Sequence, residues 1–130
     1  MSIKANELRI GNFIEYDGRI FQIDTISNEF PTLNTDEFGI GVVDWNNIQP
    51  IPLTEEWLLN FGFGIDEEYD NTFIDNTSLK NEIIRVSIDS HYFTIELFCG
   101  QVLEIPNIKY VHQLQNLYFA LTGEELTIKL

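Results

Sequence analysis

The side chains that could bind a metal ion or act as a nucleophile are few in this sequence and widely spaced. His91, Cys99 and His112 are the only imidazole and thiol groups. No two of them have the spacing of a zinc-binding pair such as Cys-x-x-Cys or His-x-x-x-His. Simple structural roles account for all three: His91 lies beside a predicted hairpin turn, Cys99 ends a predicted strand, and His112 is expected on the solvent side of a predicted helix. We therefore predict no metal site, and a single cysteine allows no disulfide within the chain.

Sequence motifs for catalysis and for ligand binding by glycine-rich or acidic loops are missing as well. There is no Gly-x-Ser-x-Gly elbow, so a Ser-His-Asp or Cys-His site would have to be assembled by the fold. Gly39-Ile-Gly41 and Gly62-Phe-Gly64 do not continue into a phosphate-binding loop. The acidic run 66–70 lacks the Asp/Asn alternation, the central glycine and the closing glutamate of an EF-hand loop. We predict no catalytic residue and no cofactor, and an enzyme ranks last among the functions considered.

The net charge is the most informative bulk property of the chain. Its 130 residues include 21 acidic and 7 basic side chains, which give a net charge of −14, divided equally between the parts before and after residue 63. A field of this sign repels nucleic acid and anionic membranes and attracts basic partners. We therefore expect neither direct nucleic-acid binding nor membrane binding. Two interpretations of the acidity stay open, namely solubility and imitation of a polyanion.

Aromatic side chains are numerous, with ten Phe, five Tyr and two Trp. Most of them fit a core, but five fall where the periodicity points away from it. These candidates for an interaction surface are Trp45, Tyr69, Tyr92, Tyr110 and Phe119. Exposed aromatics in an acidic field suit a protein interface or a ligand groove better than a nucleic-acid platform. The alternative, that they cover the join between two halves of the chain, stays open.

The elements that position these side chains are organised around a short helix predicted over residues 54–61. Thr54 is placed to cap its N-terminus, and Gly62 is placed to end it in the left-handed conformation. Leu53 and Leu58 have the spacing of a hydrophobic staple. We expect Trp57, on the same helix, to be a core residue. Pro50 and Pro52 mark the boundary between the two halves of the chain.

The fold class predicted from the remaining pattern is α+β. Residues 1–52 contain short strands over 10–16, 19–26, 39–43 and about 45–51, with a hairpin turn at Asp17-Gly18, which is typical of a small, bent, SH3-like β-sheet.

Residues 53–130 add an antiparallel β-meander over about 83–105 and a helix over about 107–122 that covers it. Residues 126–130 alternate and predict a short edge strand. The two regions form either two subdomains or one continuous globular unit.

Three blocks of the sequence carry a resemblance to other proteins. They are Leu8-Arg9-Ile10-Gly11-Asn12 followed by Tyr16-x-Gly18, the central block 51–63, and the closing block 110–126. Together they resemble a small uncharacterised protein family of phages and mobile elements of gut Bacteroidetes. No activity is established for that family, so the resemblance transfers no catalytic or binding residue. It implies expression inside a bacterial host, as an accessory or host-takeover protein.

These observations favour a non-enzymatic protein-interaction function with a protein partner, and an acidic mimic of nucleic acid is a special case of it. The alternative is a small-ligand binding or sequestering protein with a cleft between the two halves, near Trp45, Trp57 and Tyr92. No apolar run approaches the roughly 20 residues that span a bilayer, and the first residues lack the apolar core of a signal peptide. We expect a cytoplasmic protein, and a homodimer is compatible with the surplus of aromatic side chains.

Overall fold

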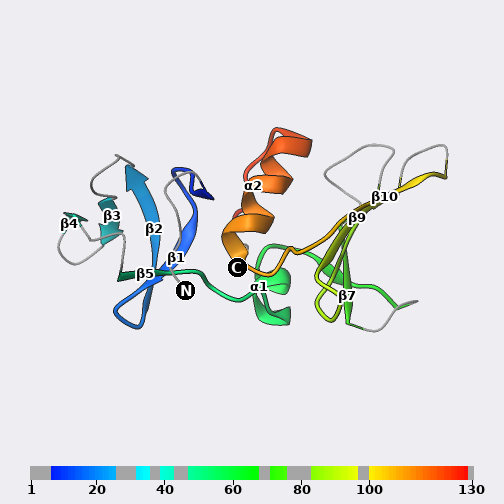
Figure 1. The fold of residues 1–130 in the computed structure, drawn as a ribbon, viewed down its shortest axis with the longest axis horizontal. Coiled ribbons are helices and arrows are strands. Elements are labelled where there is room, and N and C mark those ends of the chain that lie inside the picture. Colours follow the sequence, from blue (N-terminus) through cyan, green and yellow to red (C-terminus); the bar gives the residue numbers. More distant parts are fainter. Residues whose placement is uncertain are drawn as a thin grey trace. The chain divides into compact units, whose positions relative to one another are not determined.

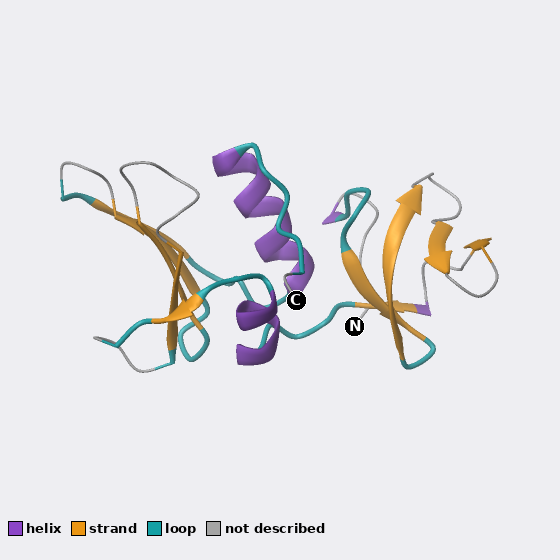
Figure 2. Ribbon diagram, turned by 180° about the vertical axis from the view of Figure 1, so that it is seen from behind, coloured by secondary structure: helices purple, strands orange, loops and turns teal. Residues whose placement is uncertain are grey.

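The computed structural model describes residues 7–25, 32–35, 39–42, 47–67, 71–75, 83–96 and 100–128, and the side chains of 24–25, 32–35 and 39–42 are not considered. The chain divides into two compact units. Unit 1 comprises residues 1–52 and 110–117, and unit 2 comprises residues 53–109 and 118–130. Each unit contains one antiparallel sheet, and the strands and helices are labelled in Figure 1 and coloured by type in Figure 2. The predicted α+β class is confirmed.

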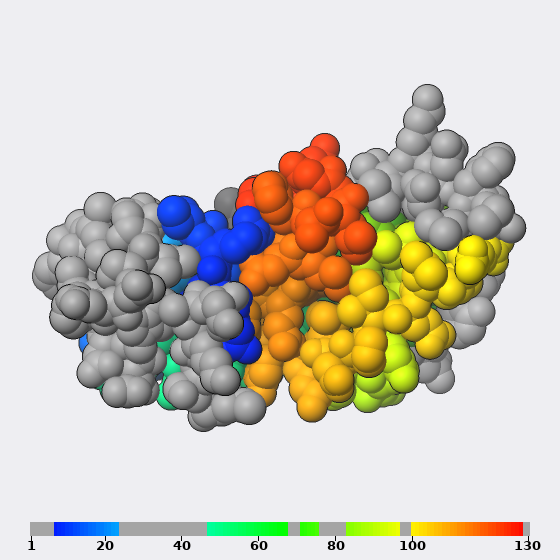
Figure 3. Space-filling model, turned by 45° about the horizontal axis from the view of Figure 1, so that its top comes forward, coloured from blue at the N-terminus to red at the C-terminus, as the bar shows by residue number. Residues whose placement is uncertain are grey.

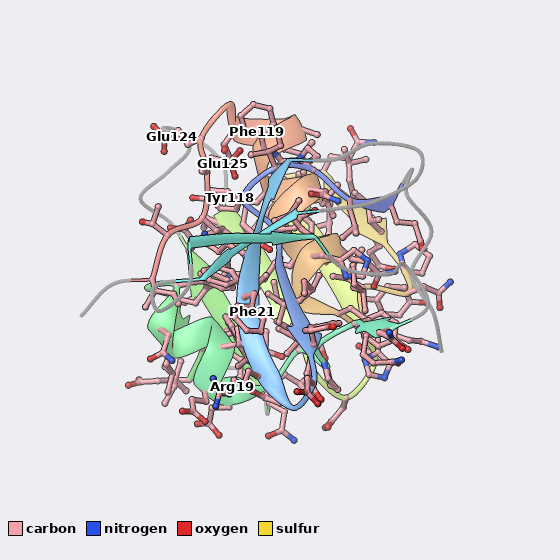
Figure 4. All side chains as sticks on the ribbon, turned by 90° about the vertical axis from the view of Figure 1, so that its left-hand side faces the viewer. Arg19, Phe21, Tyr118, Phe119, Glu124 and Glu125 are labelled. Atoms are coloured by element: carbon pink, nitrogen blue, oxygen red, sulfur yellow. The ribbon has the colours of Figure 1, made fainter. Side chains whose placement is uncertain are left out.

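The sheet of unit 1 has five strands in the order β4-β3-β2-β1-β5. Its strands are β1 (Phe13–Tyr16), β2 (Arg19–Thr25), β3 (Thr32–Thr35), β4 (Gly39–Val42) and β5 (Ile48–Gln49). Asp17 and Gly18 both have positive φ, as predicted for the turn between β1 and β2. The buried residues of this sheet form a cluster of Leu8, Ile14, Ile23 and Ile48, against which Tyr16 and Phe21 pack. Figure 4 shows Arg19 and Phe21 two positions apart along β2.

Two predicted strands in unit 1 are shorter than expected. The strand predicted from residue 10 begins at Phe13, because the backbone turns before it: Gly11 has φ 95°, and Asn12 N donates to Arg9 O at 3.1 Å. The strand predicted over about 45–51 is reduced to Ile48–Gln49, and residues 43–46 lie outside the described part. The sheet order places β5 beside β1, but the SH3-like character of the sheet stays a prediction.

The helix predicted over 54–61 is present as α1 (Glu55–Asn60). Thr54 caps its N-terminus by accepting a hydrogen bond from Trp57 N at 3.5 Å. At its C-terminus Gly62 has φ 96°, Phe63 N donates to Leu58 O, and Gly62 N donates to Leu59 O, each at 3.0 Å. This pair of bonds is the Schellman motif. The helix therefore begins and ends at the caps predicted from Thr54 and Gly62.

The prediction that Trp57 is a core residue is wrong. Trp57 is partly exposed and contacts Phe61, with ring centroids 5.7 Å apart. The side chains that α1 and its cap bury are Leu58 and Phe61, at 0% and 1% exposure. A six-residue helix has fewer than two turns, so it can direct only one narrow stripe into the core.

The sheet of unit 2 has five strands in the order β10-β9-β8-β7-β6, all antiparallel. They are β6 (Gly64–Ile65), β7 (Thr72–Asp75), β8 (Ile83–Ser87), β9 (Tyr92–Glu96) and β10 (Val102–Ile105). Alternate residues of the three central strands are buried, namely Phe73, Ile84, Val86, Phe93 and Ile95. The predicted meander is therefore present, with two further strands before it.

The closing helix, α2 (Val111–Thr122), begins later than the predicted start at about 107. Asn107 has φ 66°, and the residues after it pair with other segments: Ile108 N donates to His91 O, and Lys109 O accepts from Leu53 N. The left-handed conformation of Asn107 and the use of the Lys109 carbonyl outside the helix therefore move the start of α2 to Val111. The predicted strand over 126–130 is not formed at the described residues 126–128.

The second part of α2 packs on the buried face of the sheet of unit 2, as predicted. Tyr118 is 3% exposed, lies edge-on to Phe63 with ring centroids 6.4 Å apart, and donates a hydrogen bond to Asp75 Oδ2 at 2.8 Å. Asp75 pairs in register with Ile84, so it lies on the buried face.

The first part of α2 is held in unit 1 by the buried amide side chain of Gln115. Gln115 Oε1 accepts from Phe13 N at 2.8 Å and from Asn12 Nδ2 at 3.4 Å, and Gln115 Nε2 donates to Gly11 O at 3.1 Å. Gln115 and Asn12 are 1% and 0% exposed. The side chain therefore supplies partners for backbone groups at the point where the chain turns into β1.

Asn116 extends this hydrogen-bond network. Its Oδ1 accepts from Arg9 Nε at 2.9 Å and from Asn12 Nδ2 at 2.8 Å, while its Nδ2 donates to Glu7 O at 2.8 Å. Arg9 N donates in turn to Asn12 Oδ1 at 2.6 Å. The polar residues of the opening block are thus bonded to the polar residues of the closing helix, which makes their role structural.

We predict that Leu58→Ala lowers the free energy of unfolding by about 2 to 5 kcal/mol, because it leaves a cavity at a fully buried site. Trp57→Ala is expected to cost less, about 1 to 3 kcal/mol, because part of the ring is already in water. Urea unfolding followed by circular dichroism measures both values. A larger cost for Trp57→Ala than for Leu58→Ala would contradict this assignment of the core.

We predict that Gln115→Leu lowers the free energy of unfolding by about 1 to 3 kcal/mol, because it removes the acceptor of Phe13 N and one of the two donors to Gly11 O. The same change at the exposed residue Gln101 is the matched control and should cost little. Amide hydrogen exchange gives a local readout, since the Phe13 N–H should lose protection in Gln115→Leu alone. Unchanged protection of that amide would show that the network is not formed.

Candidate functional site

The sheet of unit 2 has one buried face, and its opposite face forms a polar hollow of about 390 Å³. Because side chains alternate along a strand, the residues between the buried ones project to this face. Four strand residues of this kind that line the hollow carry hydroxyl groups, namely Thr72, Ser87, Tyr92 and Thr94, and Ser90 adds a fifth from the turn between β8 and β9. The remaining lining residues are Arg85, Glu96, Val102 and Glu104. The hollow therefore combines hydrogen-bonding groups, charged groups and one apolar side chain on a rigid antiparallel sheet.

Arg85, on β8, is the only cationic side chain among the described residues that line the hollow, and it forms two ion pairs. Its Nε donates to Asp66 Oδ2 at 2.9 Å and its Nη1 donates to Glu96 Oε2 at 2.8 Å. The hydrogen bond to Glu96 is the main cause of a raised pKa for Arg85, and the bond to Asp66 adds to it, against the opposing effect of burial. Arg85 is therefore always charged, and its charge is already balanced by two carboxylates.

The electrostatic balance of the hollow is acidic. The described residues that line it include two carboxylates, Glu96 and Glu104, and one guanidinium, Arg85, which is also paired with Asp66. No imidazole or thiol belongs to the set of described residues that line the hollow. The arrangement is suited to hydrogen bonding and to accepting a cationic group, because an anionic ligand would have to displace a carboxylate from Arg85.

An exposed apolar strand borders the hollow. Among the described strands, β10 is at one edge of its sheet, and its residues Val102 and Leu103 are 50% and 46% exposed. On the neighbouring strand Tyr92 is 38% exposed. The atoms of β10, yellow in Figure 3, lie at the molecular surface. We call Tyr92, Val102, Leu103 and Glu104 the β10 surface.

The structure distributes the predicted interaction residues over several places. Tyr92 lines the hollow, whereas Phe119 is 39% exposed on α2, whose Tyr118 packs on the opposite face of the same sheet (Figure 4). Tyr110 is half-buried in unit 1, where it stacks on His112 with ring centroids 6.0 Å apart. Trp45 and Tyr69 lie outside the described residues. Tyr92 and Phe119 therefore do not form one surface.

Sequence reasoning missed the hollow, although part of the signal was present. The strand alternation that predicts Ile84, Val86 and Ile95 as buried also places Arg85, Thr94 and Glu96 together on the other face. The contribution of Asp66 could not be predicted, because it depends on the pairing of β6 and β7 across residues that are distant from β8 in the sequence.

The histidines do not belong to this site. His91 lies in the turn between β8 and β9, with φ 59°, and Cys99 falls outside the described residues.

The prediction that His112 faces solvent is wrong, because its side chain is 2% exposed. The first part of α2 also buries Val111, Leu114 and Gln115, so this part of the helix is covered on more than one side. Neither ring nitrogen of His112 has a hydrogen-bond partner among the described residues. Burial lowers the pKa of His112, with the charge of Glu7 opposing the shift.

The described residues contain no group of three or more His, Cys, Asp or Glu side chains that could hold a metal ion. In the described part of the chain, no helix combines the length and the apolar character needed to cross a membrane. Comparison with protein-family models, with curated proteins and with solved structures gives no match.

We predict that His112 makes the stability of the protein depend on pH. Because its pKa is lowered in the folded state, the unfolded state binds the proton more readily, and stability is lost as the pH falls below about 6.5, the ordinary pKa of histidine. The difference in melting temperature between pH 7.5 and pH 5.5 should therefore shrink in His112→Leu.

His91→Asn is the control for this measurement, because asparagine tolerates the positive φ of that turn. It removes an imidazole outside α2 and so gives the reference for the effect of losing a histidine elsewhere in the chain. The same pH dependence in His112→Leu as in the wild type would show that His112 does not titrate differently in the two states.

Proposed function

We propose that this chain is a non-enzymatic protein-interaction protein, which acts by occupying a surface of a protein partner. The observation that carries the proposal is the β10 surface, an exposed apolar edge strand beside an acidic hollow. From the resemblance of the three sequence blocks we further propose that it acts as a cytoplasmic accessory or host-takeover protein of a phage or mobile element in its bacterial host.

The exposure of the β10 surface supports this proposal. Val102 and Leu103 are each about half exposed at a sheet edge. Natural proteins blunt such edges with lysine, proline or a covering segment, because unpaired backbone groups and apolar side chains invite other chains. The one polar side chain of this strand, Glu104, is acidic. An edge of this kind fits a contact that is made with another protein.

The charge supports a basic partner. Unit 2 contains 13 acidic and 4 basic side chains, and the hollow beside β10 is itself acidic. An acidic surface attracts a basic one over a distance set by the ionic strength and raises the rate of association. Mimicry of nucleic acid is the special case in which the partner surface is a basic nucleic-acid groove.

The hollow itself favours a second candidate, a small-ligand binding protein. Its volume of about 390 Å³ is within the range of ligand pockets, and its hydroxyl and carboxylate groups converge on one space. The ligand chemistry that fits is polar or cationic, because Arg85 is held by two carboxylates. A cleft between the two halves, as predicted from the sequence, remains a separate hypothesis.

The experiment is a tagged pull-down from a lysate of a gut Bacteroidetes bacterium, with protein and small molecules identified by mass spectrometry. The wild-type chain is compared with Leu103→Lys and with Ile20→Lys, which makes the same change at a residue that is 53% exposed on an internal strand of the other sheet. We expect a stoichiometric protein that Leu103→Lys loses and Ile20→Lys keeps, with retention that falls as salt rises.

Other results decide between the candidates. A small molecule that co-purifies without a protein would favour the ligand-binding function. A protein that both variants retain equally would remove β10 from the contact, and the absence of any stoichiometric protein would contradict the interaction function.

A further inference from the structure

We infer that β10 accepts an extended segment of a basic partner as an additional strand, with basic side chains over the polar face and apolar side chains over the buried face. The inference rests on the proposed function and specifies how the partner binds. It is carried by the position of β10 in the sheet, by the exposure of its side chains and by the charge on one of its faces.

The edge formed by β10 is the best acceptor among the described strands. The two sheets have four edges, formed by β4, β5, β6 and β10. β5 and β6 contain only two residues each, and β4 contains Gly39 and Gly41, which weaken a strand. β10 offers four residues without glycine, and alternate residues direct a backbone N–H and C=O away from β9. These groups can pair with an added strand.

The register of β10 defines what the two faces of an added strand must carry. Leu103 pairs with Ile95 and Ile105 pairs with Phe93, so Leu103 and Ile105 belong to the buried face of the sheet. Leu103 is nonetheless 46% exposed, because no described strand lies outside it. An apolar side chain of an added strand would cover it and remove apolar area from water.

The other face of β10 calls for a basic side chain. Glu104 pairs with Thr94, and Val102 pairs with Glu96, so the carboxylates of Glu104 and Glu96 lie on the same face. A lysine or arginine that projects to this face from an added strand would lie beside Glu104, and the carboxylate of Glu96 on the next strand adds to the negative potential there. Arg85 cannot fully neutralise them, because it is also bonded to Asp66.

The charge distinguishes this occupant from a second copy of the chain. Two β10 strands paired edge to edge would bring Glu104 of one copy toward the acidic face of the other, and each chain carries a net charge of −14. Like charges on directly opposed strands are destabilising. A partner of opposite charge gains from the same geometry.

The test uses fluorescein-labelled peptides and the full-length protein. The first peptide alternates lysine and valine over six residues, the second has the same composition in two blocks, and the third alternates glutamate and valine. Fluorescence anisotropy measures binding, and an amide-resolved NMR titration reports which backbone groups are affected. We expect binding of the alternating basic peptide alone, with increased protection of amides within 102–105.

Matched variants separate strand addition from general attraction. Glu104→Lys and Glu124→Lys change the net charge equally, and Glu124 is an exposed residue of unit 2 that follows α2 and belongs to no strand. We expect Glu104→Lys to weaken binding about 3- to 30-fold, because an attractive cross-strand pair becomes a repulsive one, and Glu124→Lys to change it less than twofold. Leu103→Lys should weaken binding, and Ile20→Lys should not.

Several results would overturn the inference. Equal binding of the alternating and the blocked basic peptides, or equal loss in Glu104→Lys and Glu124→Lys, would show that only net charge matters. Dimerisation of the protein alone through 102–105, detected by sedimentation and NMR, would assign the edge to a second copy. If Leu103→Lys loses the protein captured from the lysate but no peptide protects the amides of β10, the interaction function is supported and strand addition is contradicted.

Discussion

The buried amide side chains of Gln115 and Asn12 are the constraint on which unit 1 depends. The turn that leads into β1 leaves backbone groups that no strand can satisfy, and Gln115 supplies partners for Phe13 N and Gly11 O at 2.8 and 3.1 Å. Buried polar groups are stable only when such partners are present. The opening block of the sequence therefore needs the closing helix, more than 100 residues later, for its own local structure. Val111 N also donates to Ile51 O, so the central block joins the same unit.

In unit 2 one periodicity produces both the core and the candidate site. The alternation that buries Ile84, Val86 and Phe93 directs Arg85 and Thr94 to the other face, where Asp66 and Glu96 hold the guanidinium. A rigid, ion-paired sheet face is well suited to recognition, because its side chains need little ordering when a partner binds. Part of the acidity of the chain is concentrated on this face, because Glu96 and Glu104 line the hollow beside β10 together with Arg85.

The three blocks that carry the resemblance have structural roles wherever the structure describes them. Arg9 and Asn12 belong to the buried network, Thr54 and Gly62 cap α1, and Gln115 and Asn116 complete the network from α2. The β10 surface, by contrast, lies outside all three blocks.

The sequence alone determined the elements whose signals are local. The caps of α1 at Thr54 and Gly62, the Asp17-Gly18 turn and the alternation of β8 and β9 were all predicted, because each depends on residues within a few positions of one another. The fold class followed from them. What depends on distant residues could only be decided by the tertiary structure: the burial of His112 and of Gln115, the partial exposure of Trp57, the start of α2 at Val111, and the meeting of Asp66 with Arg85. The physical reason is that burial and hydrogen-bond partners are properties of the space between elements, and a periodic pattern specifies a face without specifying what covers it.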